Sequence, residues 1–371
     1  MRIIVDVMGG DMGPREALRG AIEARREWGL DLIIVGNKPL IDKELSSLKR
    51  EFDGAKKKVN GGEQLFSDNG QIQVVHAEEV IEPSEAPVQA IKRKPGSSLV
   101  TAVRLAKEAH GDAIVSAGST GALIASTLMI LGRAPNVDRP AIGVVFPTAD
   151  GQNVLLIDAG ANTEVRPKNL LQFAWMGDVF AKNVMHCQDP RVGLLNIGTE
   201  RQKGTETVKS AYDLLEHSGL HFVGNVEPRD IPFGVADVVV CDGFVGNALL
   251  KFAEGIGSFF IKVIKDEIRK SPVEEVCALF LRAGLARAAR RLDYTEYGGA
   301  PILGVAGTCI KCHGISNWRA FKNGIGVAKD MVCMNVAGEI AKAAEKTLQV
   351  DGFEPDRSRA KAERTEEHAY D

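Results

Sequence analysis

The chain has 371 residues, which is longer than one hydrophobic core usually supports, so we expect two lobes. Hydrophobic residues make up 44% and charged residues 26% of it, as in soluble globular proteins. A formal net charge of −3 and an aromatic content of 6% argue against a nucleic-acid partner, which would require a basic surface or stacking platforms.

The first residues pass directly into a strand-like apolar pattern without a charged-then-apolar leader, so we expect a cytoplasmic protein with reduced thiols. No run of about 18 uninterrupted apolar residues predicts a membrane span. Cys309, Cys312 and His313 match the spacing of a c-type haem attachment site. That chemistry requires export, so we interpret these residues as ordinary packing and predict no metal and no cofactor.

Strand-like and helix-like runs alternate, which predicts an α/β fold with a mostly parallel twisted sheet and helices on both faces. In chain order, strands are predicted at 2–7, 31–35, 72–75, 113–116, 142–146, 154–158, 192–197, 222–226 and 235–241, and helices at 14–28, 97–108, 121–131, 167–184, 205–217 and 247–270. Residues 56–70 are predicted to form a loop. Residues 1–353 should form one catalytic unit of two lobes, and the charged residues 354–371 a disordered tail.

Five predicted strands end in small, polar, glycine-bearing loops, at residues 8–11, 116–121, 158–162, 196–200 and 242–247. Ligands of open α/β sheets bind outside the carboxyl ends of the strands, and glycine lets backbone N–H groups approach an anion. Each glycine alone can simply make a turn, but Ser119, Thr120, Asn162 and Asn247 add polar groups. The predicted binding residues are Asp6, Gly9, Gly10, Asp11, Gly118, Ser119, Thr120, Gly121, Asn162, Asn196, Gly198, Glu200, Gly204, Asp242, Gly243 and Gly246.

The missing fingerprints narrow the choice of anion. The sequence contains neither the dinucleotide pattern G-x-G-x-x-G nor the nucleotide-binding pattern G-x-x-x-x-G-K-[ST]. A small anion such as phosphate fits what remains. Lys203, just beyond a strand end, can neutralise it as a point charge, although most loop lysines are simply solvated. His313 can donate to a phosphate or a leaving group, although a lone histidine is more often structural.

Several motifs resemble, in order, those of the bacterial phosphate acyltransferases; they include MRIIVDVMGGDMGP, DAIVSAGSTGAL, PRVGLLNIGTERQKG, ADVVVCDGFVGNALLK and KCHG. The resemblance extends from residue 1 to about residue 345. Ser119 stands where that family commonly has Asn, and Thr205 stands in a Lys-Gly-Asn-Glu pattern. The family transfers a fatty acyl group from acyl carrier protein to inorganic phosphate, and the acyl phosphate enters phospholipid synthesis.

The resemblance implies an isocitrate dehydrogenase/phosphotransacetylase-like fold, a homodimer and no organic cofactor. It also implies peripheral association with the membrane surface, where a membrane-bound glycerol-phosphate acyltransferase uses the product. On this basis Lys203 would hold phosphate, Asn247 would donate to the developing oxyanion, and His313 would stabilise phosphate or the departing thiolate. Two other classes stay open, an NAD-dependent decarboxylating dehydrogenase on a related fold and a non-catalytic scaffold.

Residues 256–291 are predicted to form a basic amphipathic helical hairpin. Ile256, Phe259, Phe260, Val263 and Ile264 give it an apolar stripe, and residues 262–291 carry eight basic and four acidic side chains, a net charge of +4. Such a hairpin can rest on an anionic membrane or pack in a dimer interface. Acyl carrier protein is acidic, so basic surface residues are expected to meet it; the candidates are residues 92–94, Arg133, Arg139 and 282–291.

Overall fold

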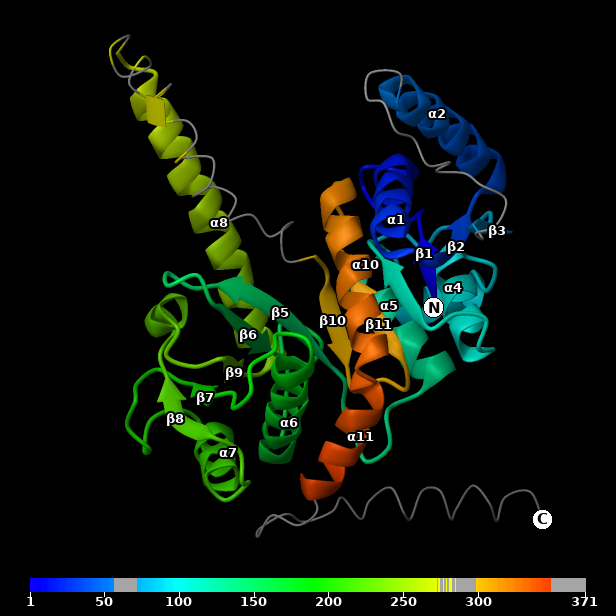
Figure 1. Ribbon diagram of the computed structural model, residues 1–371. Coiled ribbons are helices and arrows are strands. Elements are labelled where there is room, and N and C mark those ends of the chain that lie inside the picture. Colours follow the sequence, from blue (N-terminus) through cyan, green and yellow to red (C-terminus); the bar gives the residue numbers. More distant parts are fainter. Residues whose placement is uncertain are drawn as a thin grey trace, which may run out of the picture.

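The computed structural model describes residues 1–56, 72–271 and 298–347, with Val273, Val276, Ala278, Phe280, Leu281 and Gly284 between the last two ranges. An eleven-stranded sheet runs through these residues in the order β3-β2-β1-β4-β11-β10-β5-β6-β9-β7-β8 (Figure 1). Its strands are β1 (Arg2–Asp6), β2 (Asp31–Gly36), β3 (Ile72–His76), β4 (Ala113–Ser116), β5 (Ala141–Pro147), β6 (Asn153–Ile157), β7 (Val192–Leu195), β8 (Phe222–Val226), β9 (Val238–Val240), β10 (Ala300–Leu303) and β11 (Thr308–Lys311).

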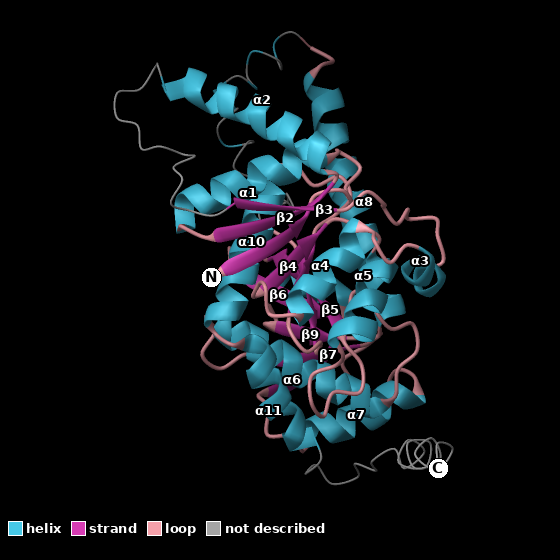
Figure 2. Cartoon of the chain, turned by 90° about the vertical axis from the view of Figure 1, so that its right-hand side faces the viewer, coloured by secondary structure: helices cyan, strands magenta, loops and turns pink. Residues whose placement is uncertain are grey.

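Helices cover both faces of this sheet (Figure 2). They are α1 (Pro14–Trp28), α2 (Lys38–Lys56), α3 (Pro87–Arg93), α4 (Ser98–Lys107), α5 (Thr120–Ser126) with the π-helical turn η1 (Thr127–Leu131), α6 (Pro167–Asn183), α7 (Glu206–Glu216), the 3₁₀ turn η2 (Pro228–Phe233), α8 (Gly243–Ile268), α10 (Trp318–Cys333) and α11 (Val336–Lys346). The predicted fold class, an α/β fold with a mostly parallel sheet between helices, is confirmed.

Three antiparallel pairings in the middle of the sheet divide it into two lobes. Two groups of strands are parallel within themselves: β3, β2, β1, β4 and β11 form one group, and β6, β9, β7 and β8 form the other. β10 and β5 lie between these groups and pair antiparallel with each other, with β11 and with β6. We call the group containing β1 the first lobe and the group containing β6 the second lobe.

The apolar runs form strands because both of their faces are covered. In β1, Ile3 and Val5 pack in one hydrophobic cluster with α1, α10 and α6, whereas Ile4 packs in a second cluster with α3 and α4. This is the pattern expected for parallel strands buried on both faces. Helix α1 begins with Pro14 and ends at Gly29, whose φ of 65° permits the left-handed cap that stops the helix.

Helix α8 begins earlier than the sequence pattern indicated. Asp242 caps it by accepting a 2.9 Å hydrogen bond from the N–H of Val245, so the helix starts at Gly243 and Asn247 lies about one turn inside it. Beyond this first turn, α8 extends away from both lobes (Figure 1). Only Gly243 and Gly246 of its 26 residues are buried. By length and composition it is long and apolar enough to cross a membrane, although a soluble protein can carry such a helix too.

Some predicted segments lie partly or wholly outside the described residues. The tail 354–371 and all but Lys56 of the loop 56–70 do so, as does most of the hairpin beyond Ser271. Strands β10 and β11 and helices α2, α3, α10 and α11 were absent from the sequence-based prediction. Of these, β10 and β11 bear most on the site, because they join the two lobes.

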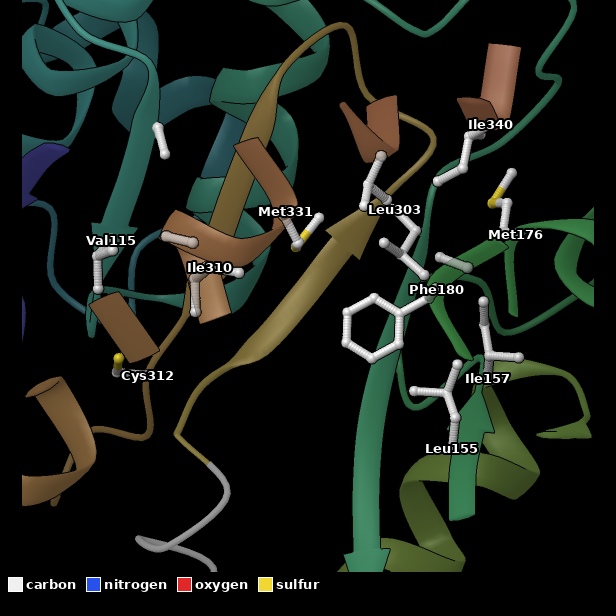
Figure 3. Packing of buried hydrophobic residues seen from close by; sticks show 14 of the residues in the cluster. Val115, Leu155, Ile157, Met176, Phe180, Leu303, Ile310, Cys312, Met331 and Ile340 are labelled. Carbon is white, nitrogen blue, oxygen red and sulfur yellow. The ribbon is translucent and has the colours of Figure 1, made fainter. Parts of the chain in front are cut away.

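The sheet splits where β10 leaves β5. The two strands pair only at Ile302 with Ile142 and at Leu303 with Ala141, and the next pair in register would join Pro301 to Gly143. Proline has no N–H to donate, so the ladder ends there. From Leu303 toward the start of β10, this strand (gold) and β5 (green) separate from each other (Figure 3).

Candidate active site

A cavity of about 470 Å³ lies between the two lobes at this split. The first lobe contributes the loops after β1, β4 and β11, and the second lobe contributes the loop after β6 and the first turns of α8. Strand β5 borders the cavity between them. The cavity is lined by residues that include Gly9, Asp11, Ala117, Gly118, Ser119, Thr120, Val144, Val145, Ala159, Gly160, Asn247, Leu250, Lys251, Glu254, Gly298, Gly299, Ala300, Lys311, His313 and Gly314.

Two glycine loops of the first lobe touch each other at the cavity. A Cβ on Gly9 would lie 2.4 Å from the Cα of Gly118, so only glycine permits this approach. Beneath the loops, Ser116 Oγ donates a 2.7 Å hydrogen bond to Asp6 Oδ2 and accepts one from the N–H of Gly118 at 3.0 Å. Burial raises the pKa of Asp6, while these hydrogen bonds oppose the rise. Asp6 therefore fixes the loops from beneath the cavity.

Lys311 supplies a cation to this side of the cavity. Its Nζ donates to the carbonyl of Ala117 at 3.1 Å and to the carbonyl of Cys312. Within the described residues its hydrogen bonds go to carbonyl oxygens and not to carboxylates, and Asp6 and Asp11 act on it only through their charge at longer range. Burial lowers the pKa of Lys311, because the charged ammonium loses hydration. An anion in the cavity would supply the missing counter-charge.

His313 is adjacent and uncharged near neutral pH. Partial burial lowers its pKa, and the positive charge of Lys251 lowers it further. The N–H of Ile315 donates to Nδ1 at 3.3 Å, which assigns the ring proton to Nε2. The imidazole can therefore donate one hydrogen bond from Nε2. Lys251, one turn along α8 from Asn247, also lines the cavity and pairs with Glu254 at 2.9 Å.

Asp158 organises the wall contributed by the second lobe. It accepts hydrogen bonds from the N–H groups of Ile142, Gly160, Ala161 and Asn162, and from the Asn162 side chain at 2.8 Å. Burial raises its pKa although these donors favour the carboxylate. This cluster holds Gly160 close to Asn247, whose Cβ would be 3.5 Å from a Cβ on Gly160.

The N-terminus of α8 packs against the same cluster. A Cβ on Gly246 would lie 1.9 Å from the carbonyl oxygen of Asp158, and a Cβ on Gly243 would lie 2.7 Å from the carbonyl oxygen of Asn162. Only glycine fits at either position. Asn247, the next residue after Gly246, is thereby placed at the cavity.

The structure brings together four of the five predicted loops. Predicted residues that line the cavity are Gly9, Asp11, Gly118, Ser119, Thr120, Asn247 and His313. Asp6, Asn162, Asp242, Gly243 and Gly246 support those loops through the contacts given above. Gly10 and Gly121 belong to the same two segments but are not among the residues that line the cavity. Gly121 packs against Pro87, whose ring would lie 2.9 Å from a Cβ at that position.

The fifth loop, after β7, contributes nothing to the cavity of this chain. Asn196 is buried and its Nδ2 donates to the carbonyl of Lys203 at 3.0 Å, which closes the loop on itself around Gly198 and Gly204. Lys203 and Glu200 are exposed. The roles predicted for these residues stay predictions.

Lys311, Lys251 and Glu254 are the charged residues that the sequence reasoning missed. Lys311 belongs to the motif KCHG, in which only the histidine was singled out. Lys251 is paired with Glu254, and Asp11 also lines the cavity. Lys311, a neutral imidazole, a carboxamide and glycine-bounded N–H groups are the features that suit a small anion and a developing negative charge. Within the described ranges, no three His, Cys, Asp or Glu residues are grouped as metal ligands.

The sequence profile of the fatty acid synthesis protein family matches residues 1–339. A phosphate acyltransferase of Alkaliphilus oremlandii is 44% identical over 354 residues, which cover 95% of this chain and 100% of the relative. The phosphate acyltransferase of Heliobacterium modesticaldum is 47% identical over 340 residues, which cover 92% and 96%.

Solved structures share the fold at low identity. A branched-chain phosphotransacylase from Enterococcus faecalis superposes with a TM-score of 0.53 at 14% identity, covering 90% of this chain and 99% of that one. The EutD phosphotransacetylase from Staphylococcus aureus gives 0.51 at 14% identity, covering 93% and 94%. The predicted phosphotransacetylase-like fold is confirmed. The chain belongs to the fatty acid synthesis protein family of phosphate acyltransferases, and it is an enzyme of the transferase class.

Proposed function

We propose that this chain transfers a fatty acyl group from acyl carrier protein to inorganic phosphate and releases acyl phosphate and free carrier protein. The observation that supports this most strongly is the cation Lys311 beside two touching glycine loops, without a carboxylate partner among the described residues. Phosphate is the small dianion that the site's charge and size suit. The apolar side chain of Leu250, which lines the same cavity, can contact the first carbons of an acyl chain.

The reaction needs positioning and charge stabilisation more than acid–base chemistry. A phosphate oxygen attacks the thioester carbonyl carbon, and the new C–O bond forms as the carbonyl oxygen becomes an oxyanion. The oxyanion then collapses, the C–S bond breaks, and the sulfur leaves as a thiolate that takes a proton from solvent. Asn247 donates to the oxyanion, and His313 donates from Nε2 to phosphate or to the thiolate.

Lys311 holds the attacking phosphate in this account, and Lys203 is the second candidate. Lys203 lies outside the cavity of its own chain, so it acts only if its loop moves or a partner subunit presents it. Comparing Lys311→Met with Lys203→Ala separates the two. A larger rise in the KM for phosphate in the Lys203 variant than in the Lys311 variant would assign phosphate binding to the loop after β7.

The donor is tested by supplying the same acyl chain on acyl carrier protein and on coenzyme A, with phosphate, a chelator and no NAD. Acyl phosphate, trapped with hydroxylamine, should form from the carrier-protein thioester. Formation from another donor but not from this one would reject acyl carrier protein. Dependence on NAD would favour the dehydrogenase class, and no product from any thioester would favour a scaffold.

We also propose that the enzyme is a cytoplasmic homodimer that associates with the membrane surface, where a membrane-bound glycerol-phosphate acyltransferase takes up its product. Support comes from α8, whose Phe259 and Phe260 are 57% and 55% exposed. A long helix with this much exposed apolar surface requires a partner. Phe259→Asp should lower the mass measured by light scattering if α8 forms the dimer. Phe280→Asp, at an 85% exposed position, should reduce liposome flotation if the region beyond α8 touches lipid.

A further inference from the structure

The cavity fills the space where two strands of the sheet should pair. The observed pairs, Ile302 with Ile142 and Leu303 with Ala141, set the register between β10 and β5. Extending it places Ala300 opposite Val144 and Gly299 opposite Val145. All four of these residues line the cavity. The gap between the strands is therefore one in which strand pairing is missing, and it opens into the site that contains Asn247 and His313.

Val145 directs its backbone polar groups into this gap. The N–H of Leu155, its partner on β6, donates to the carbonyl of Asp237 on the β9 side instead of to Val145. At the near end of β5, Ile142 directs its N–H to Asp158 and its carbonyl to Ala159, both on the β6 side. Because backbone groups alternate along a strand, those of Val145 face the opposite edge. The described part of the chain offers them no strand partner.

Two features keep the gap open. The first is Pro301, which has no N–H to donate to Gly143, so the ladder of hydrogen bonds cannot extend past this pair. The two residues still pack together, since the Cγ of Pro301 would lie 3.4 Å from a Cβ on Gly143. Gly298 and Gly299 have no side chains to fill the space beyond. Backbone groups that are removed from solvent are almost always hydrogen-bonded, to protein, ligand or water, so an unpaired strand edge inside a ligand cavity offers hydrogen bonds to a ligand with complementary groups.

We infer that the gap binds the amide-bearing arm on which the acyl group arrives, as an added strand along the edge of β5. This rests on the proposed function, since carrier proteins hold acyl chains as thioesters on a pantetheine arm, an extended chain with two secondary amides. One amide carbonyl accepts from the N–H of Val145, and one amide N–H donates to its carbonyl. This is recognition by strand addition, which depends on main-chain groups. It also explains how the thioester reaches Asn247 and His313 in a fixed position.

The first test uses the unmodified enzyme and two donors that carry the same acyl chain. One is acyl-pantetheine, and the other is its analogue with both amides replaced by esters. Lost amide hydrogen bonds should lower kcat/KM for the ester analogue by about tenfold. Equal kcat/KM for the two donors would overturn the subsite while leaving phosphate acylation in place.

The second test removes the N–H of Val145. Val145→Pro deletes it at an unpaired edge, where proline is tolerated best, and Val145→Ala retains it. The ratio of kcat/KM between the two donors should fall from about ten to about three in the proline variant and keep its original value in the alanine variant. Identical ratios in the two variants would place the amides elsewhere.

A third measurement tests the subsite even if the proline variant does not fold or if the enzyme acylates no acceptor. Free pantetheine should slow hydrogen exchange of the Val145 N–H in the unmodified protein, measured by NMR. No slowing at saturating pantetheine would reject the subsite independently of activity. Slowing without acyl phosphate from any thioester would retain the subsite and reject the proposed function.

Discussion

The Nζ of Lys311 donates a 3.1 Å hydrogen bond to the carbonyl oxygen of Ala117, so a side chain at the end of β11 holds the loop that follows β4. The two residues are 194 positions apart in the chain and meet because β11 and β4 pair in parallel. The same bond aims a cation with a lowered pKa at the cavity. Structure and charge at the site therefore depend on one residue.

Lys311→Met should lower the rate of acyl phosphate formation by about 100-fold, because the phosphate loses its counter-charge. Its Tm without phosphate should change little, because removal of a buried ammonium stabilises the folded state while loss of the hydrogen bonds to the carbonyls of Ala117 and Cys312 destabilises it. Hydroxylamine trapping measures the rate, and scanning calorimetry with and without inorganic phosphate measures thermal stability and phosphate binding. Phosphate should raise the Tm of the unmodified enzyme but not of the variant.

The control is Lys342→Met, which removes an exposed lysine of α11 that pairs with Glu339. Its rate and its response to phosphate should match the unmodified enzyme. An active Lys311→Met variant whose Tm still rises with phosphate would show that Lys311 does not bind it.

Asn247→Ala should lower kcat by about 100- to 1,000-fold, because the oxyanion loses a donor that acts mainly in the transition state. The KM for phosphate should change little. Steady-state kinetics at varied phosphate measures both constants. Asn153→Ala, at an exposed position of β6, is the matched control. A raised KM with unchanged kcat would assign Asn247 to substrate binding instead.

The pH dependence of His313 follows from its lowered pKa. The neutral ring should persist below pH 6.5, the ordinary pKa of histidine, and protonation should set in only at lower pH. The ratio of kcat/KM for phosphate between the unmodified enzyme and His313→Gln reports the ligand-free enzyme and removes the titration of phosphate, which both share. We expect this ratio to stay constant from pH 8 to about 6.5 and to change only below that. A change centred above 6.5 would mean that the pKa is raised.

Gly246→Ala should destabilise the protein by about 3 kcal/mol or more, because its Cβ would overlap the carbonyl of Asp158. Gly255→Ala is a strict comparison, since Gly255 lies in the same helix and a Cβ there meets nothing within 4 Å. It should stabilise by roughly 0.5 to 1 kcal/mol through helix propensity. Urea unfolding measures both. Equal effects would mean that the start of α8 is not packed as described.

The sequence predicted those parts of the fold that local patterns control. The bounds of α1 matched because Pro14 and Gly29 mark its ends, and those of β4 matched because it is an apolar run between turns. The bounds of β8 matched too, although it contains Gly224 and Asn225. β10 was missed because it includes Pro301 and follows two glycines, and β11 was missed because only two of its four residues, Cys309 and Ile310, are apolar. Such segments resemble loops until their partners are known.

The candidate site divides in the same way. Glycine loops after strands can be identified from the chain alone, and four of the five line the cavity. Lys311 could not be predicted, because its importance comes from the pairing of β11 with β4. The gap beside Val145 could not be predicted either, since it exists only where β10 and β5 separate.

Radiolabelled inorganic phosphate gives the most direct test of the account. Purified enzyme, acyl carrier protein thioester and labelled phosphate should yield labelled acyl phosphate and free carrier thiol in equal amounts, and Lys311→Met should yield about 100-fold less of both. Release of thiol without labelled acyl phosphate would mean that water, and not phosphate, accepts the acyl group. Equal product from the two enzymes would contradict the assignment of the phosphate site.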